Sequence, residues 1–279
     1  MSRPYRSVLY IPGSNERALE KARGLAADAI IFDLEDAVAP AEKPAARATL
    51  KAALAEDYGP RARIVRINGL DTEWGREDAA AFATGADAVL VPKVSTPADL
   101  DAVAALTGDT PLWAMMETAL GMLNASAIAA HPRLEGMVMG TNDLAKELGA
   151  RFRPDRLPMM AGLGLCLLAA RAHRRVIVDG VFNAFKDDDG LRAECEQGRD
   201  MGFDGKTLIH PTQLEPANTS FAPTEEEVRR AKLVIEAFER PEYAKRGAIK
   251  LEGRLYERQH LGVNRRAVTW AEAIRAKGF

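Results

Sequence analysis

Short apolar segments recur along this chain, and each of them ends in a polar or charged group. The clearest spans residues 30–38, where β-forming residues lead into Asp33, Glu35 and Asp36. An apolar run of this length, bounded by loop residues, is typical of a strand buried on both faces. The strands predicted in this way span residues 7–13, 30–38, 63–68, 88–94, 112–118, 136–140, 176–180 and 206–210.

Helical patterns lie between these strands. The predicted helices include residues 15–27, 42–56, 121–130, 159–173, 191–201 and 225–239, with another beginning after Thr96. Alternating strands and helices favour a parallel sheet, because each crossover must lie over one face of it. Eight such units within residues 1–240 predict an α/β fold, a (β/α)8 TIM barrel. An open doubly wound sheet is the alternative, although no GxGxxG follows the first strand.

The segment 241–279 does not continue the alternation. It contains a basic loop, the short sequence KLEGRLYE and a last helical pattern around Trp270. We expect a C-terminal helical extension that acts as a lid or packs on a neighbouring subunit. The simpler alternative is a helix that closes the bottom of the barrel.

Composition excludes several classes of function. The net charge of -2 gives no reason to expect a nucleic-acid or anionic-membrane partner. No apolar run reaches the ~18 residues that a membrane helix needs. The first residues enter a strand pattern directly, without a signal peptide, and Cys166 and Cys195 have no metal-type spacing. We therefore expect a cytoplasmic protein with reduced thiols.

Polar groups at the ends of the predicted strands give the candidate site, because barrel active sites lie at the carboxyl ends of the strands. Single charges directly after apolar runs are costly unless they have a use or a partner. These groups are Pro12 to Ser14, Asp33 with Glu35 and Asp36, Arg66 with Asn68, Lys93, Glu117, Asn142 with Asp143, Asp179 with Asn183, and His210.

Glu117 and Asp143 form the best candidate metal pair, since they follow adjacent strands. Two carboxylates with several waters suit Mg²⁺, with Mn²⁺ as a possible substitute, whereas zinc would need a His or Cys cluster. The alternative is that one carboxylate pairs structurally with Arg66 or Lys93. Arg66 itself suits a carboxylate or a thioester carbonyl, or a salt bridge to Asp33 or Glu35.

Other catalytic arrangements have little support. The histidines other than His210 have no obvious partner, so a Ser-His-Asp triad is not indicated. The sequence PGSNER is too short for a Walker loop, although amides at a helix start can hold a phosphate. From the residues alone, we predict a Mg²⁺-dependent barrel enzyme that stabilises an enolate or an oxyanion.

The motifs VLYIPGS, FDLEDAV, RIN, VPKV, METALG, GTNDLA and GFDGKTLIHPTQ occur in this order. Together they resemble the citrate lyase β-subunit and malyl-CoA lyase family over essentially the whole chain. The resemblance implies a (β/α)8 barrel with a C-terminal extension, Mg²⁺ and a β-hydroxyacyl-CoA thioester substrate. It also implies a homotrimer or homohexamer in which the extension of one subunit completes the site of its neighbour.

The resemblance also implies roles for single residues. The metal ligands of the family correspond to Glu117 and Asp143, and its substrate arginine corresponds to Arg66. Contacts to CoA correspond to Tyr10 and Lys21, with further substrate contacts from Asn142, Ile209 and His210. An arginine that often follows the Gly-Ser of the first loop is Asn15 here, and Arg17 is the nearest replacement for its charge.

The C-terminal extension departs from the family pattern. Lyases that resemble this protein carry a catalytic Asp in a segment like EGxMxD, whereas residues 252–257 read EGRLYE and place Glu257 there. Glutamate can transfer the same proton but is one methylene longer, and small displacements of such a group matter. A branch resembling the (3S)-malyl-CoA thioesterases has Glu at this place and is also the most similar along the chain.

Two reactions therefore remain open. The first, which we favour, is hydrolysis of a thioester such as (S)-malyl-CoA to malate and CoA, with Glu257 or a loop carboxylate such as Asp33 directing water. The second is carbon–carbon cleavage of malyl-, β-methylmalyl- or citramalyl-CoA to acetyl- or propionyl-CoA and an oxo acid such as glyoxylate. A non-catalytic subunit that binds CoA esters is a third possibility, which the intact set of Arg66, Glu117 and Asp143 disfavours.

Overall fold

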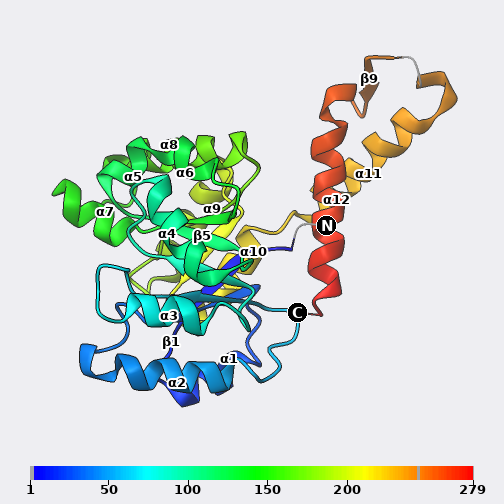
Figure 1. Ribbon diagram of the computed structural model, residues 1–279. Coiled ribbons are helices and arrows are strands. Elements are labelled where there is room, and N and C mark those ends of the chain that lie inside the picture. Colours follow the sequence, from blue (N-terminus) through cyan, green and yellow to red (C-terminus); the bar gives the residue numbers. More distant parts are fainter. Residues whose placement is uncertain (1–2, 244–245, 279) are drawn as a thin grey trace. The chain divides into compact units, whose positions relative to one another are not determined.

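The computed structural model describes residues 3–243 and 246–278. Eight parallel strands form a closed barrel in chain order, with β1 also paired to β8 (Figure 1). The strands are β1 Ser7–Pro12, β2 Ala29–Asp33, β3 Ala62–Arg66, β4 Ala88–Val91, β5 Leu112–Met116, β6 Leu134–Met139, β7 Val176–Asp179 and β8 Gly205–Leu208. The predicted (β/α)8 barrel is confirmed.

Helices follow the strands and cover the outside of the barrel (Figure 1). They are α1 Glu16–Ala22, α2 Lys43–Ala53, α3 Gly75–Ala81, α4 Pro97–Thr107, α5 Ala119–Leu123, α6 Ala125–Ala129, α7 Thr141–Leu148, α8 Met160–Ala172, α9 Asp188–Met201 and α10 Leu214–Ser220. The start of α4 illustrates local sequence control: Thr96 and Asp99 form a capping box and Pro97 occupies the first turn.

One predicted helix, residues 121–130, is divided into α5 and α6. Asn124 lies between them with φ -96° and ψ 8°, and its side-chain amide donates to the carbonyl of Ser95 at 2.8 Å. This tertiary hydrogen bond offers the backbone an alternative to a continuous helix.

Strand alternation sorts the core into two parts. Side chains that point inward fill the barrel, among them Ile31, Ile64, Leu90 and Trp113. Those that point outward, such as Ile30, pack against the helices in a larger cluster. Because successive side chains on a strand alternate between faces, the same parity decides which strand-end groups enter the barrel mouth.

The C-terminal unit has its own small core. Contacts group Ala222–Phe279 with the first residues of the chain, apart from the barrel unit Tyr5–Phe221. This division lies earlier than the predicted boundary at residue 240, because α11 Glu225–Glu239 packs against α12 Leu261–Ala276 and belongs to the same unit. Between them in the sequence, β9 Ala248–Leu251 and β10 Arg254–Glu257 form an antiparallel hairpin, which contains the KLEGRLYE segment.

The hairpin turn explains the Glu-Gly pair of this segment. Glu252 and Gly253 have φ values of 46° and 79°, as a tight two-residue turn with both central residues at positive φ requires. Ile249 from the hairpin packs with Val234, Phe238 and Leu261 of the two helices.

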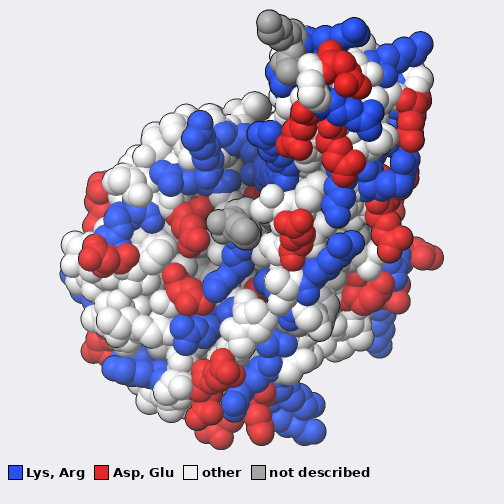
Figure 2. Space-filling model, turned by 90° about the vertical axis from the view of Figure 1, so that its right-hand side faces the viewer, with Lys and Arg blue, Asp and Glu red and all other residues white. Residues whose placement is uncertain are grey.

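The surface carries both signs of charge. Basic and acidic side chains are interspersed over the face drawn in Figure 2, in keeping with the net charge of -2. None of the helices in the described part of the chain is long and apolar enough to cross a membrane.

Candidate active site

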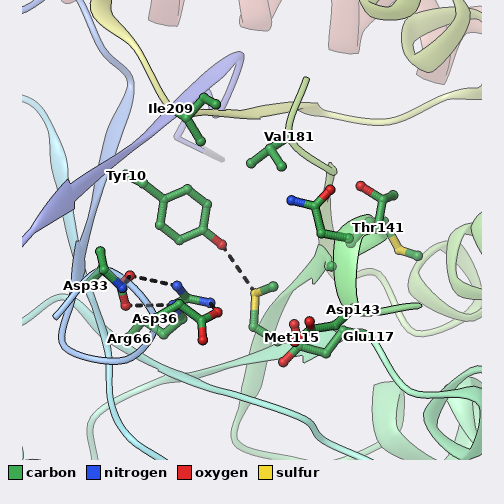
Figure 3. Close-up of a pocket in the computed structure, with 14 residues that line it drawn as sticks. Tyr10, Asp33, Asp36, Arg66, Met115, Glu117, Thr141, Asp143, Val181 and Ile209 are labelled. Carbon is green, nitrogen blue, oxygen red and sulfur yellow. Dashed lines mark hydrogen bonds and ion pairs between the residues drawn. The ribbon is translucent and has the colours of Figure 1, made fainter. Parts of the chain in front are cut away.

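A cavity of about 300 Å³ opens at the carboxyl ends of the barrel strands. Four different strands each direct one side chain into it from an inward-pointing position at the end of the strand, namely Tyr10, Asp33, Arg66 and Glu117 (Figure 3). Asp36 and Ile209 from the loops after β2 and β8, and Asn142 and Asp143 from the start of α7, also line it. The cavity lies where the sequence predicted a site, and the predicted strand-end residues that line it are Asp33, Asp36, Arg66, Glu117, Asn142 and Asp143.

Arg66 and Asp33 form a two-pronged ion pair across adjacent strands. Arg66 Nε donates to Asp33 Oδ1 and Nη2 to Oδ2, both at 2.7 Å, as Figure 3 shows. The Asp33 oxygens also accept the backbone N–H groups of Glu35 and Ala37. Burial of Arg66 opposes its positive charge. Asp33 nevertheless holds the pKa of Arg66 well above its usual value, so Arg66 stays a cation in a fixed orientation.

Glu35 adds a second carboxylate beside Arg66. Its Oε2 lies 2.8 Å from Arg66 Nη1, and its Oε1 lies 3.2 Å from Lys93 Nζ. Burial raises the pKa of Glu35 despite these two cations. Behind it, Lys43 Nζ donates to the carbonyls of Leu34 and Glu35, which ties the loop after β2 to the barrel.

Glu117 enters the mouth from the end of β5. Its Oε1 accepts the backbone N–H of Lys93 at 2.7 Å. Gly140 at the end of β6 leaves room for the other oxygen, since a Cβ there would lie 2.5 Å from Glu117 Oε2. Burial, with the Glu35 carboxylate adding to it, raises the pKa of Glu117 to about 7.

Asp143 lines the same cavity from the first turn of α7, where the helix dipole favours a negative charge. Figure 3 draws its carboxylate beside that of Glu117, and its charge contributes to the raised pKa of Glu117. Next to it, the side-chain amides of Asn142 and Asn183 exchange two hydrogen bonds of 3.2 and 2.8 Å. Asn142 is thereby held at the rim.

Tyr10 forms the wall opposite these carboxylates. Its ring packs against the guanidinium of Arg66, with 5.1 Å between the ring centroid and Cζ, and its hydroxyl donates to Met115 Sδ at 3.4 Å. Burial raises the pKa of Tyr10, so the phenol stays neutral. Tyr10 therefore supplies a hydroxyl and an aromatic face inside the cavity.

The donor set of the mouth suits a hard divalent cation. Carboxylates outnumber basic groups, and Glu117 combines a raised pKa with an oxygen, Oε2, that accepts no hydrogen bond from the described residues. In residues 3–243 and 246–278, no cluster of three or more His, Cys, Asp or Glu residues could hold a metal alone. Two carboxylates completed by waters and substrate oxygens match the preference of Mg²⁺.

Some predicted residues of the barrel unit lie outside this cavity. Lys21 is exposed in the last turn of α1 and does not line the cavity. His210 caps the short turn before α10: its Nδ1 lies 2.8 Å from Thr212 Oγ1, and its ring stacks on Phe185. Glu257 ends β10 in the C-terminal unit, where it accepts from Gln259 Nε2.

The backbone amides of residues 209 and 210 are already engaged. The N–H groups of Ile209 and His210 both donate to Gln213 Oε1, at 2.9 and 3.2 Å. Ile209 therefore offers the cavity its side chain.

Two strand-end groups point outward from the barrel, against expectation. Asp179 bonds Arg156 and Lys206 between the barrel and α9, and Asn68 bonds Asp78 and Lys43. Asp179 lies one residue out of register with the inward position Val178 of β7, so parity directs it away from the mouth. Asn68 lies two residues beyond the end of β3, where its hydrogen bonds and not strand parity set its direction.

Sequence reasoning missed the apolar lining of the mouth. Met115, Met139, Thr141 and Val181 complete the cavity wall. Counting inward positions back from Glu117 would have found Met115, whereas Met139, Thr141 and Val181 depend on how β6 and β7 turn into their loops.

Comparison with known proteins agrees with this geometry. A model of the HpcH/HpaI aldolase/citrate lyase family matches residues 6–211. A (3S)-malyl-CoA thioesterase of Cereibacter sphaeroides is 69% identical over 98% of this chain and 96% of its own length. The citrate lyase subunit beta of Leuconostoc mesenteroides is 36% identical over 91% of this chain and 88% of its own length.

Solved structures of CitE from Mycobacterium tuberculosis share the fold. The complex with magnesium, acetoacetate and coenzyme A superposes with a TM-score of 0.81 and 32% identity, over 96% of this chain and 98% of that one. RipC from Yersinia pestis gives a TM-score of 0.70 and 32% identity, over 80% and 98%. With its closed barrel, its acidic mouth and these relatives, the chain belongs to the HpcH/HpaI aldolase/citrate lyase family.

Proposed function

We propose that this protein is a Mg²⁺-dependent enzyme that hydrolyses a β-hydroxyacyl-CoA such as (S)-malyl-CoA to malate and CoA. The observation that carries the proposal is the mouth cavity, which brings Arg66 together with Glu117 and Asp143 in a chain 69% identical to a (3S)-malyl-CoA thioesterase. Structures of the CitE relative with both magnesium and coenzyme A support the metal and the substrate class.

Glu117 and Asp143 would hold the metal. When bound, Mg²⁺ orients oxygen ligands of the substrate and stabilises negative charge that develops on them. Their placement at the mouth supports this role, as does the position of Glu117, where the backbone of Lys93 engages only one of the two carboxylate oxygens. Mn²⁺ has the same preference for oxygen ligands and is a plausible substitute.

Arg66 would bind the thioester carbonyl or the acyl carboxylate. The Asp33 pair holds two of its nitrogens, so its orientation is set before substrate binds, and preorganised charge is the most effective kind. Both Asp33 oxygens are already engaged, so we assign Asp33 the orientation of Arg66. Tyr10 would close the acyl cavity beside Arg66.

Glu257 is our candidate for directing water or moving the proton, as the family resemblance implies. We extend the proposal to a homotrimer or homohexamer, to a C-terminal unit that serves as lid and oligomerisation element, and to a cytoplasmic location. Lys21, Asn142 and the 209–210 turn remain candidates for CoA contacts.

Carbon–carbon cleavage is the second candidate. The 36% identity to a citrate lyase subunit favours it, because that relative shares the fold and 91% of this chain aligns with it. Cleavage would use the same Arg66 and carboxylate pair to hold an oxo acid and an enolate.

One incubation separates the two reactions. Purified protein with (S)-malyl-CoA and Mg²⁺ is followed for free thiol, malate, glyoxylate and acetyl-CoA, with a chelator as the control. We expect thiol and malate in equal amounts and no glyoxylate. Glyoxylate matched by acetyl-CoA would show a lyase instead. If neither appears with malyl-, β-methylmalyl- or citramalyl-CoA, the proposal is wrong.

A further inference from the structure

Lys93 lies two residues after the end of β4 and has an unusual backbone conformation. Its φ is 52°, in the left-handed region, which a residue with a Cβ adopts only at a cost in free energy. Such a conformation persists where the surrounding contacts determine it, and it is frequent at functional sites. Lys93 contacts both Glu117, a proposed metal ligand, and Glu35, which pairs with Arg66.

The backbone of Lys93 fixes one carboxylate. Its N–H donates to Glu117 Oε1 at 2.7 Å. With that oxygen engaged, the other is left beside Gly140, where the missing Cβ provides space. The left-handed turn therefore determines which Glu117 oxygen is available to a ligand in the cavity.

The side chain of Lys93 contacts a second carboxylate, that of Glu35. Its Nζ lies 3.2 Å from Glu35 Oε1, and Glu35 Oε2 lies 2.8 Å from Arg66 Nη1. The Glu35 side chain is 11% exposed, and its Oε2 forms no well-directed hydrogen bond within the described chain. The position of this carboxylate therefore depends on the two cations beside it.

We infer that Lys93 is a positioning residue: its amide fixes Glu117, and its ammonium holds Glu35 against Arg66. The metal-binding and substrate-binding groups thereby keep a constant spacing. This inference rests on the proposed function and adds to it two residues, Lys93 and Glu35, that line a neighbouring cavity.

A simple surface ion pair is the competing explanation. The Lys93 side chain is 57% exposed, and exposed pairs contribute little on average. What argues for positioning is that one strained residue contacts two site groups through different atoms. The two explanations predict different results when the amine and the backbone constraint are removed separately.

The test compares Lys93→Met, which removes the charge, with Lys93→Gly, which also relaxes the backbone. The exposed Lys51→Met on α2 is the matched control. Calorimetry gives the Mg²⁺ dissociation constant, steady-state kinetics give kcat and KM, and thermal unfolding checks folding.

We expect Lys93→Met to lose about tenfold in kcat/KM with a Mg²⁺ dissociation constant no higher than wild type. Lys93→Gly should raise that constant roughly threefold or more.

A double-mutant cycle with Glu35→Gln tests the route. Because the amine acts through Glu35, Lys93→Met combined with Glu35→Gln should lose no more than the larger single variant, and Lys93→Arg should restore kcat/KM within about threefold. Additive losses, unchanged kcat/KM in Lys93→Met, or equal Mg²⁺ constants for the Met and Gly variants would overturn the inference. If wild type turns over no acyl-CoA, the proposed function fails, while the Mg²⁺ constants still test the backbone part.

Discussion

Two charged clusters of the barrel differ in how their carboxylates are balanced. The mouth cluster consists of Asp33, Glu35, Arg66, Lys93 and Glu117, and the outer cluster of Arg156, Asp179, Glu194 and Lys206. Both are largely buried at strand ends. They lie on opposite faces of the same sheet because side chains alternate along a strand.

In the outer cluster, each carboxylate has a cation beside it. Asp179 lies 2.6 Å from Arg156 Nη1 and 3.1 Å from Lys206 Nζ, and Lys206 Nζ also contacts Glu194. Although burial opposes its ionisation, Lys206 and Arg156 hold the pKa of Asp179 below the usual range. A buried carboxylate with such partners needs no ligand and serves the structure.

In the mouth cluster, the carboxylates outnumber the cations. Arg66 and Lys93 form ion pairs with two carboxylates, Asp33 and Glu35, and Glu117 is left with a backbone hydrogen bond and a pKa of about 7. An added cation would satisfy the surplus negative charge. The comparison teaches that burial of a strand-end carboxylate does not reveal its role, whereas the balance of its partners does.

The largest effect should come from Glu117→Gln. It removes one proposed metal ligand while keeping the shape, so Mg²⁺-dependent turnover should fall at least about 1000-fold, or about 4 kcal/mol. Stability of the metal-free protein should not fall, because a poorly compensated buried charge is lost. Turnover with and without chelator and urea unfolding measure the two effects. Activity that survives both the substitution and the chelator would show that the metal site is misplaced.

The opposite pattern is expected for Lys206→Met. It leaves Asp179 and Glu194 with one fewer cation in a dry environment, so the free energy of unfolding should drop by about 3 kcal/mol. Turnover per folded molecule should stay near wild type. Urea unfolding at neutral pH gives the first quantity and kinetics at low temperature the second. A large catalytic loss in the folded variant would break the distinction between the clusters.

A smaller change should follow from Gly140→Ala. The new Cβ would meet Glu117 Oε2 at 2.5 Å and displace the carboxylate, weakening Mg²⁺ binding roughly tenfold to a hundredfold. Gly164→Ala on α8 is the control, since a Cβ there meets no atom within 4 Å. Calorimetry with Mg²⁺ compares the two. Equal constants for both variants would mean that the carboxylate has room to move without loss.

The pH dependence of Mg²⁺ binding should be the mildest effect. Glu117 has a raised pKa of about 7 in the metal-free protein, so binding below pH 7 must release a proton. The dissociation constant should therefore rise about tenfold per pH unit below 7 and level off above it. Calorimetry in two buffers of different ionisation enthalpy measures the released proton. Binding that does not depend on pH between 5.5 and 7 would contradict the assignment of Glu117.

The same raised pKa sets the sign for stability without metal. Between the unfolded value and about 7, the folded state holds the extra proton, so the metal-free protein should lose stability as pH rises through 7. Asp179 acts in the opposite direction: its lowered pKa contributes stability at neutral pH that is lost in acid.

By itself, the sequence determined the barrel and most of its mouth. Alternating strand and helix patterns leave few topologies, and a parallel barrel gathers its strand ends at one rim, so Arg66, Glu117 and Asp143 could be placed together in advance. Helix starts such as Thr96-Pro97 were also readable, because capping is a local interaction.

Only the tertiary structure decided the direction and partners of each group. Asp33 and Asp179 both end apolar strands, yet one holds Arg66 in the mouth and the other binds Lys206 behind the barrel. The hairpin before Glu257, the division at residue 222, and the hydrogen bond from Lys93 to Glu117 were equally beyond the sequence pattern. The physical reason is that strand parity, and contacts between residues far apart in the chain, depend on where each strand starts and turns, and a shift of one residue reverses the outcome.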